Sequence, residues 1–259
     1  MTSIKNQTVM ITGASSGIGA ACAELFAKAG ARLILVARRE SRLISLISRL
    51  QEIYPDLESH LLQLDICDRQ AVEKSLNNLP EKWRQIDVLV NNAGLAAGRA
   101  KIQEAEIDDW EAMIDTNVKG LLYVTRQVLP NMLARNQGYI INIGSIAVHH
   151  AYSGGSVYCG TKACVRSISQ ALRQDICGSG IRVTEIDPGL VETEFSLVRF
   201  KGDETIAQNV YQGMTPLTPM DVADTVIYCV NRPAHVNLAE IVLFPTDQAA
   251  AQVIHRRAE

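Results

Sequence analysis

Short apolar runs alternate along this chain with longer segments whose apolar residues recur at helical spacing. The run Arg32–Ala37 holds four large apolar residues in succession, which is typical of a strand covered on both faces of a parallel sheet. Seven runs of this kind are predicted to be strands: Thr8–Thr12, Arg32–Ala37, Leu61–Leu64, Val88–Val90, Ile140–Ile143, Val183–Ile186 and Ile241–Phe244.

Helices are predicted between these strands. Gly30 is suited to end the first helix because glycine tolerates positive φ, and Pro55 should stop an amphipathic helix that carries Leu43, Leu46 and Leu50. The first of these helices is predicted over residues 18–29, and the others cover residues 68–78, 108–136, 156–178 and 220–231. Strand–helix alternation with right-handed crossovers predicts an α/β protein, a single Rossmann-fold domain over residues 1–259. Its doubly wound parallel sheet should have about seven strands with helices on both faces.

Composition and charge narrow the class of protein. The chain is 47% hydrophobic and 20% charged, which is ordinary for a soluble globular domain. With 25 basic and 28 acidic residues it lacks the basic excess of a nucleic-acid binder, so no nucleic-acid partner is expected. No apolar run approaches the ~18 residues that span a bilayer, and the first residues do not resemble a signal segment. These features predict a cytoplasmic protein without a membrane partner.

The cysteines do not indicate disulfides or a metal. The six are Cys22, Cys67, Cys159, Cys164, Cys177 and Cys229, and no two of them form a C-x-x-C pair. Small buried thiols are the interpretation favoured for a cytosolic chain of this size. No metal site is predicted, because no His/Cys/Asp cluster has ligand spacing along the chain.

The turn after the first strand has the pattern of a phosphate-binding loop. It reads Thr-Gly-Ala-Ser-Ser-Gly-Ile-Gly over residues 12–19 and leads directly into a helix. Glycines there permit a tight turn and close approach of the backbone to a pyrophosphate, which the helix N-terminus attracts. The residues predicted to bind the dinucleotide are Gly13, Ser15, Ser16, Gly17, Ile18 and Gly19.

The end of the second strand indicates which dinucleotide is bound. Arg38 and Arg39 stand where a carboxylate would select a free ribose 2′-hydroxyl, so NADP(H) is the predicted cofactor, with Ser15 as a possible helper. The alternative is that the two arginines only solvate the start of a helix. After the third strand, Asp65 and Ile66 are predicted to bracket the adenine ring.

Three positions that follow later strands carry candidate catalytic groups: the sequence Asn-Asn-Ala-Gly at 91–94, Ser145, and Tyr158 with Lys162. Tyr158 and Lys162 are four residues apart and project from one helix face. A phenol with a pKa of about 10 is a poor base at neutral pH, and a nearby ammonium favours its ionised form. Together with the glycine turn, these motifs resemble the short-chain dehydrogenase/reductase family over essentially the whole chain.

The resemblance implies roles for individual residues. Tyr158 is expected to be the general acid/base, Lys162 to lower its pKa and bind the nicotinamide ribose, and Ser145 to hold the substrate oxygen. Asn117 matches the family's fourth catalytic position, and Asn91 is expected to brace the central strand. Further implied cofactor contacts are Asn92, Ala93, Gly94, Tyr158, Lys162, Pro188, Gly189, Val191 and Thr193.

The segment at about 190–215 is expected to form a substrate lid, where loop variation sets specificity. The run from Pro188 to Gly202, with the later motifs Leu-Thr-Pro-x-Asp-Val at 217–222 and Pro-Ala-His-Val-Asn at 233–237, resembles one subgroup. This subgroup is the NADP-dependent 3-hydroxy acid dehydrogenases, which include serine and L-allo-threonine dehydrogenases. Their small-molecule substrates carry a carboxylate, for which Arg199 is the first candidate ligand and Lys201 the second. Alternatively, both are solvated lid charges. His149 and His150 either shape the pocket or are ordinary loop polar residues.

Two other functions stay open. One is an NADPH-dependent reductase of neutral ketones or 3-oxoacyl thioesters, although the tail Val242–Thr246 lacks the glycine-rich ending typical of oxoacyl reductases. The other is a non-catalytic dinucleotide sensor, which would be expected to have lost Tyr158, Lys162 or Ser145. The family resemblance also implies a homotetramer assembled through the helices predicted at 108–136 and 156–178.

Overall fold

A computed structural model of the chain describes residues 4–257. Seven strands form one parallel sheet in the order β3-β2-β1-β4-β5-β6-β7, which confirms the predicted fold class. The strands are β1 Thr8–Thr12, β2 Arg32–Ala37, β3 Ser59–Gln63, β4 Val88–Asn91, β5 Gly138–Ile143, β6 Ile181–Pro188 and β7 Glu240–Leu243.

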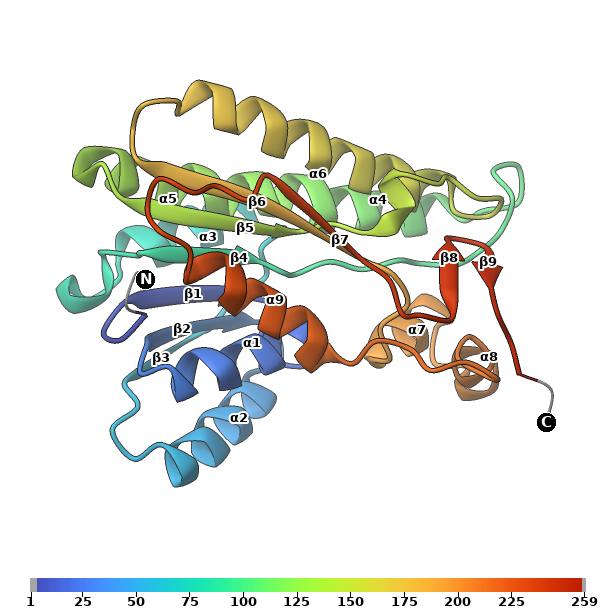
Figure 1. Cartoon of the computed structure of the whole chain (residues 1–259), viewed down its shortest axis with the longest axis horizontal. Coiled ribbons are helices and arrows are strands. Elements are labelled where there is room, and N and C mark those ends of the chain that lie inside the picture. The colour runs from blue at the N-terminus through green and yellow to red at the C-terminus, as the bar shows by residue number, and fades with distance from the viewer. Residues whose placement is uncertain (1–3, 258–259) are drawn as a thin grey trace.

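Helices cover both faces of the sheet (Figure 1). The main helices are α1 Gly17–Lys28, α2 Glu40–Ile53, α3 Arg69–Asn77, α4 Ile107–Ile114, α5 Leu121–Arg135, α6 Ser156–Asp175 and α9 Pro219–Val230. The apolar run of β2 explains why both faces are covered. Leu33 and Leu35 pack into the core beneath α1, α2 and α9, whereas Ile34 and Val36 pack into the core beneath α3, α5 and α6. As expected, Gly30 follows the end of α1 with a φ of +77°.

The helix predicted over 108–136 is interrupted. Between α4 and α5 the backbone forms a π-helical segment, η2, over Asp115–Gly120, and this segment carries Asn117. Gly120 packs so closely on Ile66 that a Cβ there would lie 2.6 Å from the Ile66 Cδ1 atom. Such π segments occur frequently at functional sites, and apolar periodicity does not reveal one.

Short elements gather beyond the carboxyl ends of β6 and β7, at the right of Figure 1. They are α7 Glu194–Arg199, α8 Glu204–Asn209 and the antiparallel pair β8 Gln248–Ala250 and β9 Val253–Ile254. The sequence predicted a lid here but not its helices, since six residues are too few to display a helical period. Single short turns also occur at η1 Glu81–Trp83 and η3 Ile146–Val148.

The strand order reverses direction between β1 and β4, and in sheets of this kind ligands bind beyond the carboxyl ends of the strands at such a point. Both the glycine turn after β1 and the 91–94 segment after β4 therefore lie at the predicted binding edge. Within residues 4–257, no helix is long and apolar enough to cross a bilayer.

Candidate active site

A cavity of about 1010 Å³ lies at this edge of the sheet, large enough for a cofactor and a small substrate. Its wall extends from the turn after β1 past the carboxyl ends of β4 and β5 to α7. Of the residues predicted to bind the cofactor, bind the substrate or take part in catalysis, all line this cavity except Gly19 and Asn117, which lie behind the wall, and Lys201, the second carboxylate candidate.

The glycine turn is built for close backbone contact. Gly13 has a φ of +66°, and a Cβ there would lie 2.8 Å from the Ala93 Cα atom. At Gly19 a Cβ would lie 2.4 Å from the Gly13 carbonyl oxygen. The side chain of Ser16, the N-cap of α1, makes no capping hydrogen bond, so the first N–H groups of this 12-residue helix face the cavity mouth unshielded. The turn therefore fits the pyrophosphate of a dinucleotide.

An anion-binding cluster follows β2. Arg39 donates to Ser16 Oγ at 2.9 Å and to Glu194 Oε2 at 3.0 Å, while Arg42 pairs with the other oxygen of the same carboxylate. These hydrogen bonds from Arg42 and Arg39 hold the pKa of Glu194 below its usual range. Arg38 extends into solvent 3.9 Å from Asp65 Oδ2. The guanidinium groups thus already bind a carboxylate where the sequence predicted a 2′-phosphate.

Arg42 and Glu194 were not among the residues predicted from the sequence. Arg42 could have been found, because it lies three residues after Arg39 at the start of α2 and shares its helix face. Glu194 is 155 residues from Arg39 in the chain, and nothing local indicates that α7 begins beside α2.

Tyr158 and Lys162 lie buried on one face of α6. The Lys162 ammonium donates to the Ile143 carbonyl oxygen at 2.8 Å and lies 6.0 Å from the centroid of the Tyr158 ring. Burial lowers the pKa of Lys162 to about 8, against the opposing charges of Asp187 and Glu185. The ammonium is thus a buried cation held by one carbonyl and by nearby carboxylates.

The phenol of Tyr158 differs from the sequence-based expectation. Burial raises its pKa well above the usual value, although a hydrogen bond with Ser145 and the charge of Arg199 both act to lower it. The sequence predicted that Lys162 would lower the pKa of Tyr158. Among the protein's own groups this pKa is raised instead, because burial of the phenol is the largest influence on it.

Asn117 braces the cavity wall from behind. Its side chain exchanges two hydrogen bonds with the backbone of Leu95, both 2.8 Å long, and its amide also donates to Thr161 Oγ1 at 3.0 Å. Asn91 bridges Thr125 and Asn142 between neighbouring elements, as expected of a strand brace.

Arg199 reaches back from α7 to Tyr158. Its guanidinium carbon lies 5.7 Å from the Tyr158 ring centroid, and its Nη1 donates to the Tyr152 hydroxyl at 3.0 Å. Its buried Nη2 has no hydrogen-bond partner among the described residues. Lys201 is outside the cavity wall and pairs with Asp109 at 3.0 Å. Tyr152 was not predicted, since a lone tyrosine in a loop carries no pattern.

Comparisons with known proteins agree with this geometry. Residues 7–203 match the family model described as short chain dehydrogenase. The chain belongs to the short-chain dehydrogenase family.

Individual relatives are similar over nearly their whole length. The NADP-dependent 3-hydroxy acid dehydrogenase YdfG of Salmonella typhi is 48% identical over 96% of this chain and 99% of its own. Serine 3-dehydrogenase of Agrobacterium fabrum is 43% identical over 94% and 96%. A solved closed form of serine dehydrogenase complexed with NADP+ superposes with a TM-score of 0.91 at 46% identity, covering 97% and 100% of the two chains. The resemblance drawn from the sequence is confirmed.

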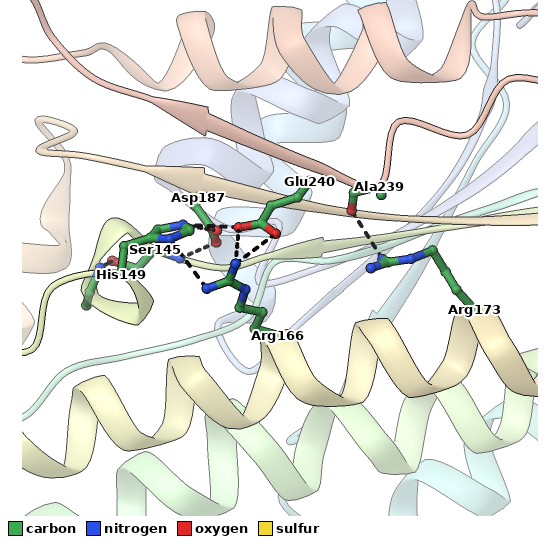
Figure 2. Close-up of polar contacts among 8 residues, drawn as sticks. Ser145, His149, Arg166, Arg173, Asp187, Ala239 and Glu240 are labelled. Atoms are coloured by element: carbon green, nitrogen blue, oxygen red, sulfur yellow. Dashed lines mark hydrogen bonds and ion pairs between the residues drawn. The ribbon is translucent and has the colours of Figure 1, made fainter.

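In this short-chain dehydrogenase the two histidines after Ser145 do not line the cavity. His149 turns toward Asp187 and Glu240 (Figure 2). His150 is exposed. One side-chain nitrogen or oxygen atom from each of His149, Asp187 and Glu240 lies within 4.8 Å of the other two, the grouping that a metal site would need. Spacing along the chain could not reveal this cluster. Arg166 pairs with Glu240 at 3.1 Å, so a guanidinium already supplies the positive charge there. Of the six cysteines, which were expected to be buried thiols, Cys22, Cys159 and Cys229 are buried, Cys67 and Cys164 are partly buried, and Cys177 is exposed.

Proposed function

We propose that this chain is an NADP(H)-dependent oxidoreductase that oxidises small 3-hydroxy acids. The observation that carries the proposal is the unpaired, buried Nη2 of Arg199 beside the ring of Tyr158. A buried guanidinium N–H is costly without a partner, and a substrate carboxylate would satisfy it within reach of the reacting hydroxyl. The names of the relatives support the same substrate class.

The cofactor fits the residues present. The glycine turn would hold the pyrophosphate, Arg38 and Arg39 the 2′-phosphate, and Lys162 the nicotinamide ribose; bound NADP+ supplies the hydride acceptor. The solved serine dehydrogenase with NADP+ supports this choice. Because Glu194 already pairs with Arg39 and Arg42, a 2′-phosphate would compete with this carboxylate.

In the proposed reaction the protein positions the alcohol and removes its proton. Ser145 would donate to the substrate oxygen and hold it in line with the departing hydride. The Tyr158 phenolate would accept the hydroxyl proton, and the Lys162 ammonium would favour that phenolate. Asn117 would keep Leu95 and Thr161 in place around Lys162, which matches its brace of the cavity wall.

Arg199 and Tyr152 would form the carboxylate subsite. The Tyr152 hydroxyl accepts from Arg199, which leaves its own proton free to donate to the same carboxylate. Both side chains line the cavity beside Phe195 of α7. The segment at about 190–215 that carries Arg199 would act as the substrate lid.

The family's usual assembly and compartment belong to the proposal as well: a homotetramer in the cytoplasm. Large apolar side chains are exposed along α4 and α5, where a neighbouring subunit would cover them. They are Ile107, Ile114, Leu122 and Leu133.

The paired change Arg38→Ala and Arg39→Ala tests the cofactor. Loss of the guanidinium groups is expected to weaken NADPH binding about 10- to 100-fold and NADH binding about twofold or less, by fluorescence titration. Glu194→Gln is the matched opposite: it removes the competing carboxylate, so NADPH should bind about two- to threefold more tightly. An equal loss for both dinucleotides would contradict the 2′-phosphate contact.

Tyr158→Phe tests the proton transfer. The substitution deletes only the phenol oxygen, so kcat is expected to fall by about 10²- to 10⁴-fold, the usual contribution of a general acid/base. NADPH affinity should change about twofold at most. Turnover close to that of the unmodified enzyme would show that another group moves the proton.

Arg199→Met tests the carboxylate subsite. Loss of a charge-assisted hydrogen bond is expected to raise KM for a 3-hydroxy acid by about tenfold or more while the Kd for NADPH stays unchanged. Lys201→Met is the control, because Lys201 pairs with Asp109 away from the cavity. If the two variants have the same KM, Arg199 is not the carboxylate ligand.

A further inference from the structure

Asp187 at the end of β6 holds both ends of the short turn that carries Ser145. Its Oδ1 accepts from the Ser145 backbone N–H at 2.9 Å, and its Oδ2 lies 3.0 Å from His149 Nε2 (Figure 2). Ser145 is the N-cap of η3 and His149 is its C-cap. A single buried carboxylate therefore fixes the whole helical turn, Ile146–Val148, against the sheet.

The carboxylate lies as close to the chain as its atoms allow. Gly144 precedes Ser145, and a Cβ at that position would lie 1.9 Å from Asp187 Oδ1 and 2.8 Å from Glu185 Oε1. Only glycine fits there, so the carboxylate packs directly beneath the backbone that leads into Ser145.

His149 is itself fixed from two further elements. Glu240, the first residue of β7, lies 3.2 Å from His149 Nε2, and the guanidinium of Arg166 on α6 pairs with Glu240 at 3.1 Å. Arg166 Nη1 also lies 3.4 Å from His149 Nδ1. Because Tyr158, Lys162 and Arg166 are spaced four residues apart, the helix that presents the acid/base tyrosine also anchors this cluster.

We propose that His149 and Arg166, acting through Asp187 and Glu240, form a positioning clamp that holds Ser145 in register with Tyr158 and makes turnover depend on the ionisation of Asp187. The inference rests on the proposed function only in assigning Ser145 the substrate oxygen. A divalent cation is a poorer occupant of this cluster, because it would face the guanidinium of Arg166.

The charged groups around Asp187 set the direction of its response to pH. Asp187 faces His149 from the η3 turn, Lys162 from α6, Glu240 from β7, and Glu185 on its own strand. Arg166 of α6 contacts the same cluster through Glu240 and His149. Burial raises the pKa of Asp187, and the hydrogen bond and charge of His149 lower it. Asp187 is thus ionised above its pKa and loses its charge as the pH falls through it; without His149 that loss occurs at higher pH.

The test compares His149→Phe, which removes the contact, with His149→Gln, whose amide can still donate to Asp187. Ketone reduction with NADPH is followed against pH, using acetoacetate or its ethyl ester, whichever the unmodified enzyme reduces faster. Reduction requires protonated Tyr158, so the acid limb of kcat reports another group. His149→Phe is expected to lower kcat about tenfold and move this limb to higher pH, with NADPH affinity unchanged. His149→Gln should restore most of both.

Arg173→Gln is the matched control. Arg173 lies seven residues after Arg166 on α6 and donates to the backbone carbonyl of Ala239 (Figure 2). Within residues 4–257 its one other partner is the backbone carbonyl of Val183, so its loss should leave the limb in place. Ser145→Ala distinguishes a failure of the proposed role of Ser145 from a failure of the clamp. If it retains turnover, the proposed role of Ser145 fails; if it loses turnover while His149→Phe has an unchanged acid limb, the clamp fails.

A second readout does not need turnover. The chain has three Gly-Ser pairs, Gly144–Ser145, Gly155–Ser156 and Gly178–Ser179, so labelling glycine carbonyl carbon with ¹³C and serine with ¹⁵N selects three amide signals. The signal missing from Ser145→Ala is Ser145. Its shift should titrate with Asp187, at a higher midpoint in His149→Phe. An unchanged midpoint would overturn the clamp whatever the enzyme's substrate.

Discussion

The site depends on keeping one positive charge inside the protein. Lys162 is buried, and burial lowers its pKa to about 8 even with the opposing charges of Asp187 and Glu185 in place, close to the point where the charge is lost. The Ile143 carbonyl and the charges of Asp187 and Glu185 oppose that loss. Buried carboxylates in turn need partners of their own, because an unpaired buried ion costs several kcal/mol. His149 partners Asp187, and Arg166 partners Glu240 beside it.

Because each buried charge needs a partner of its own, the active site extends behind the cavity. The cavity wall presents Ser145, Tyr158 and Lys162, yet their positions rest on groups from β5, β6, β7 and α6 that no substrate would touch. Asp187 is the penultimate residue of β6, immediately before the Pro188–Gly189 segment. The same strand end therefore positions Ser145 on one side and leads on the other into the segment that carries Arg199.

Much of this could be read from the sequence, because the signals are local. Alternating apolar runs gave all seven strands of the sheet, and the four-residue spacing of Tyr158 and Lys162 placed both on one helix face. Long-range pairings could not be read in this way. The Glu194–Arg39 pair and the cluster of His149, Asp187 and Glu240 join segments that only the crossovers bring together. The π segment around Asn117 was not predicted, because its six residues, Asp115–Gly120, are too few to establish an apolar period of their own.

The pKa of Tyr158 could not be predicted from neighbouring residue types. The nearby Lys162 ammonium suggested a lowered pKa, but burial raises it. The central claim, a buried carboxylate subsite beside that phenol, is tested most directly by kcat/KM for NADP+ reduction with L-allo-threonine and with its methyl ester. The acid is expected to be preferred by about tenfold or more, because only its carboxylate can pair with the buried guanidinium of Arg199. Equal values, or a preference for the ester, would contradict it and indicate a neutral substrate.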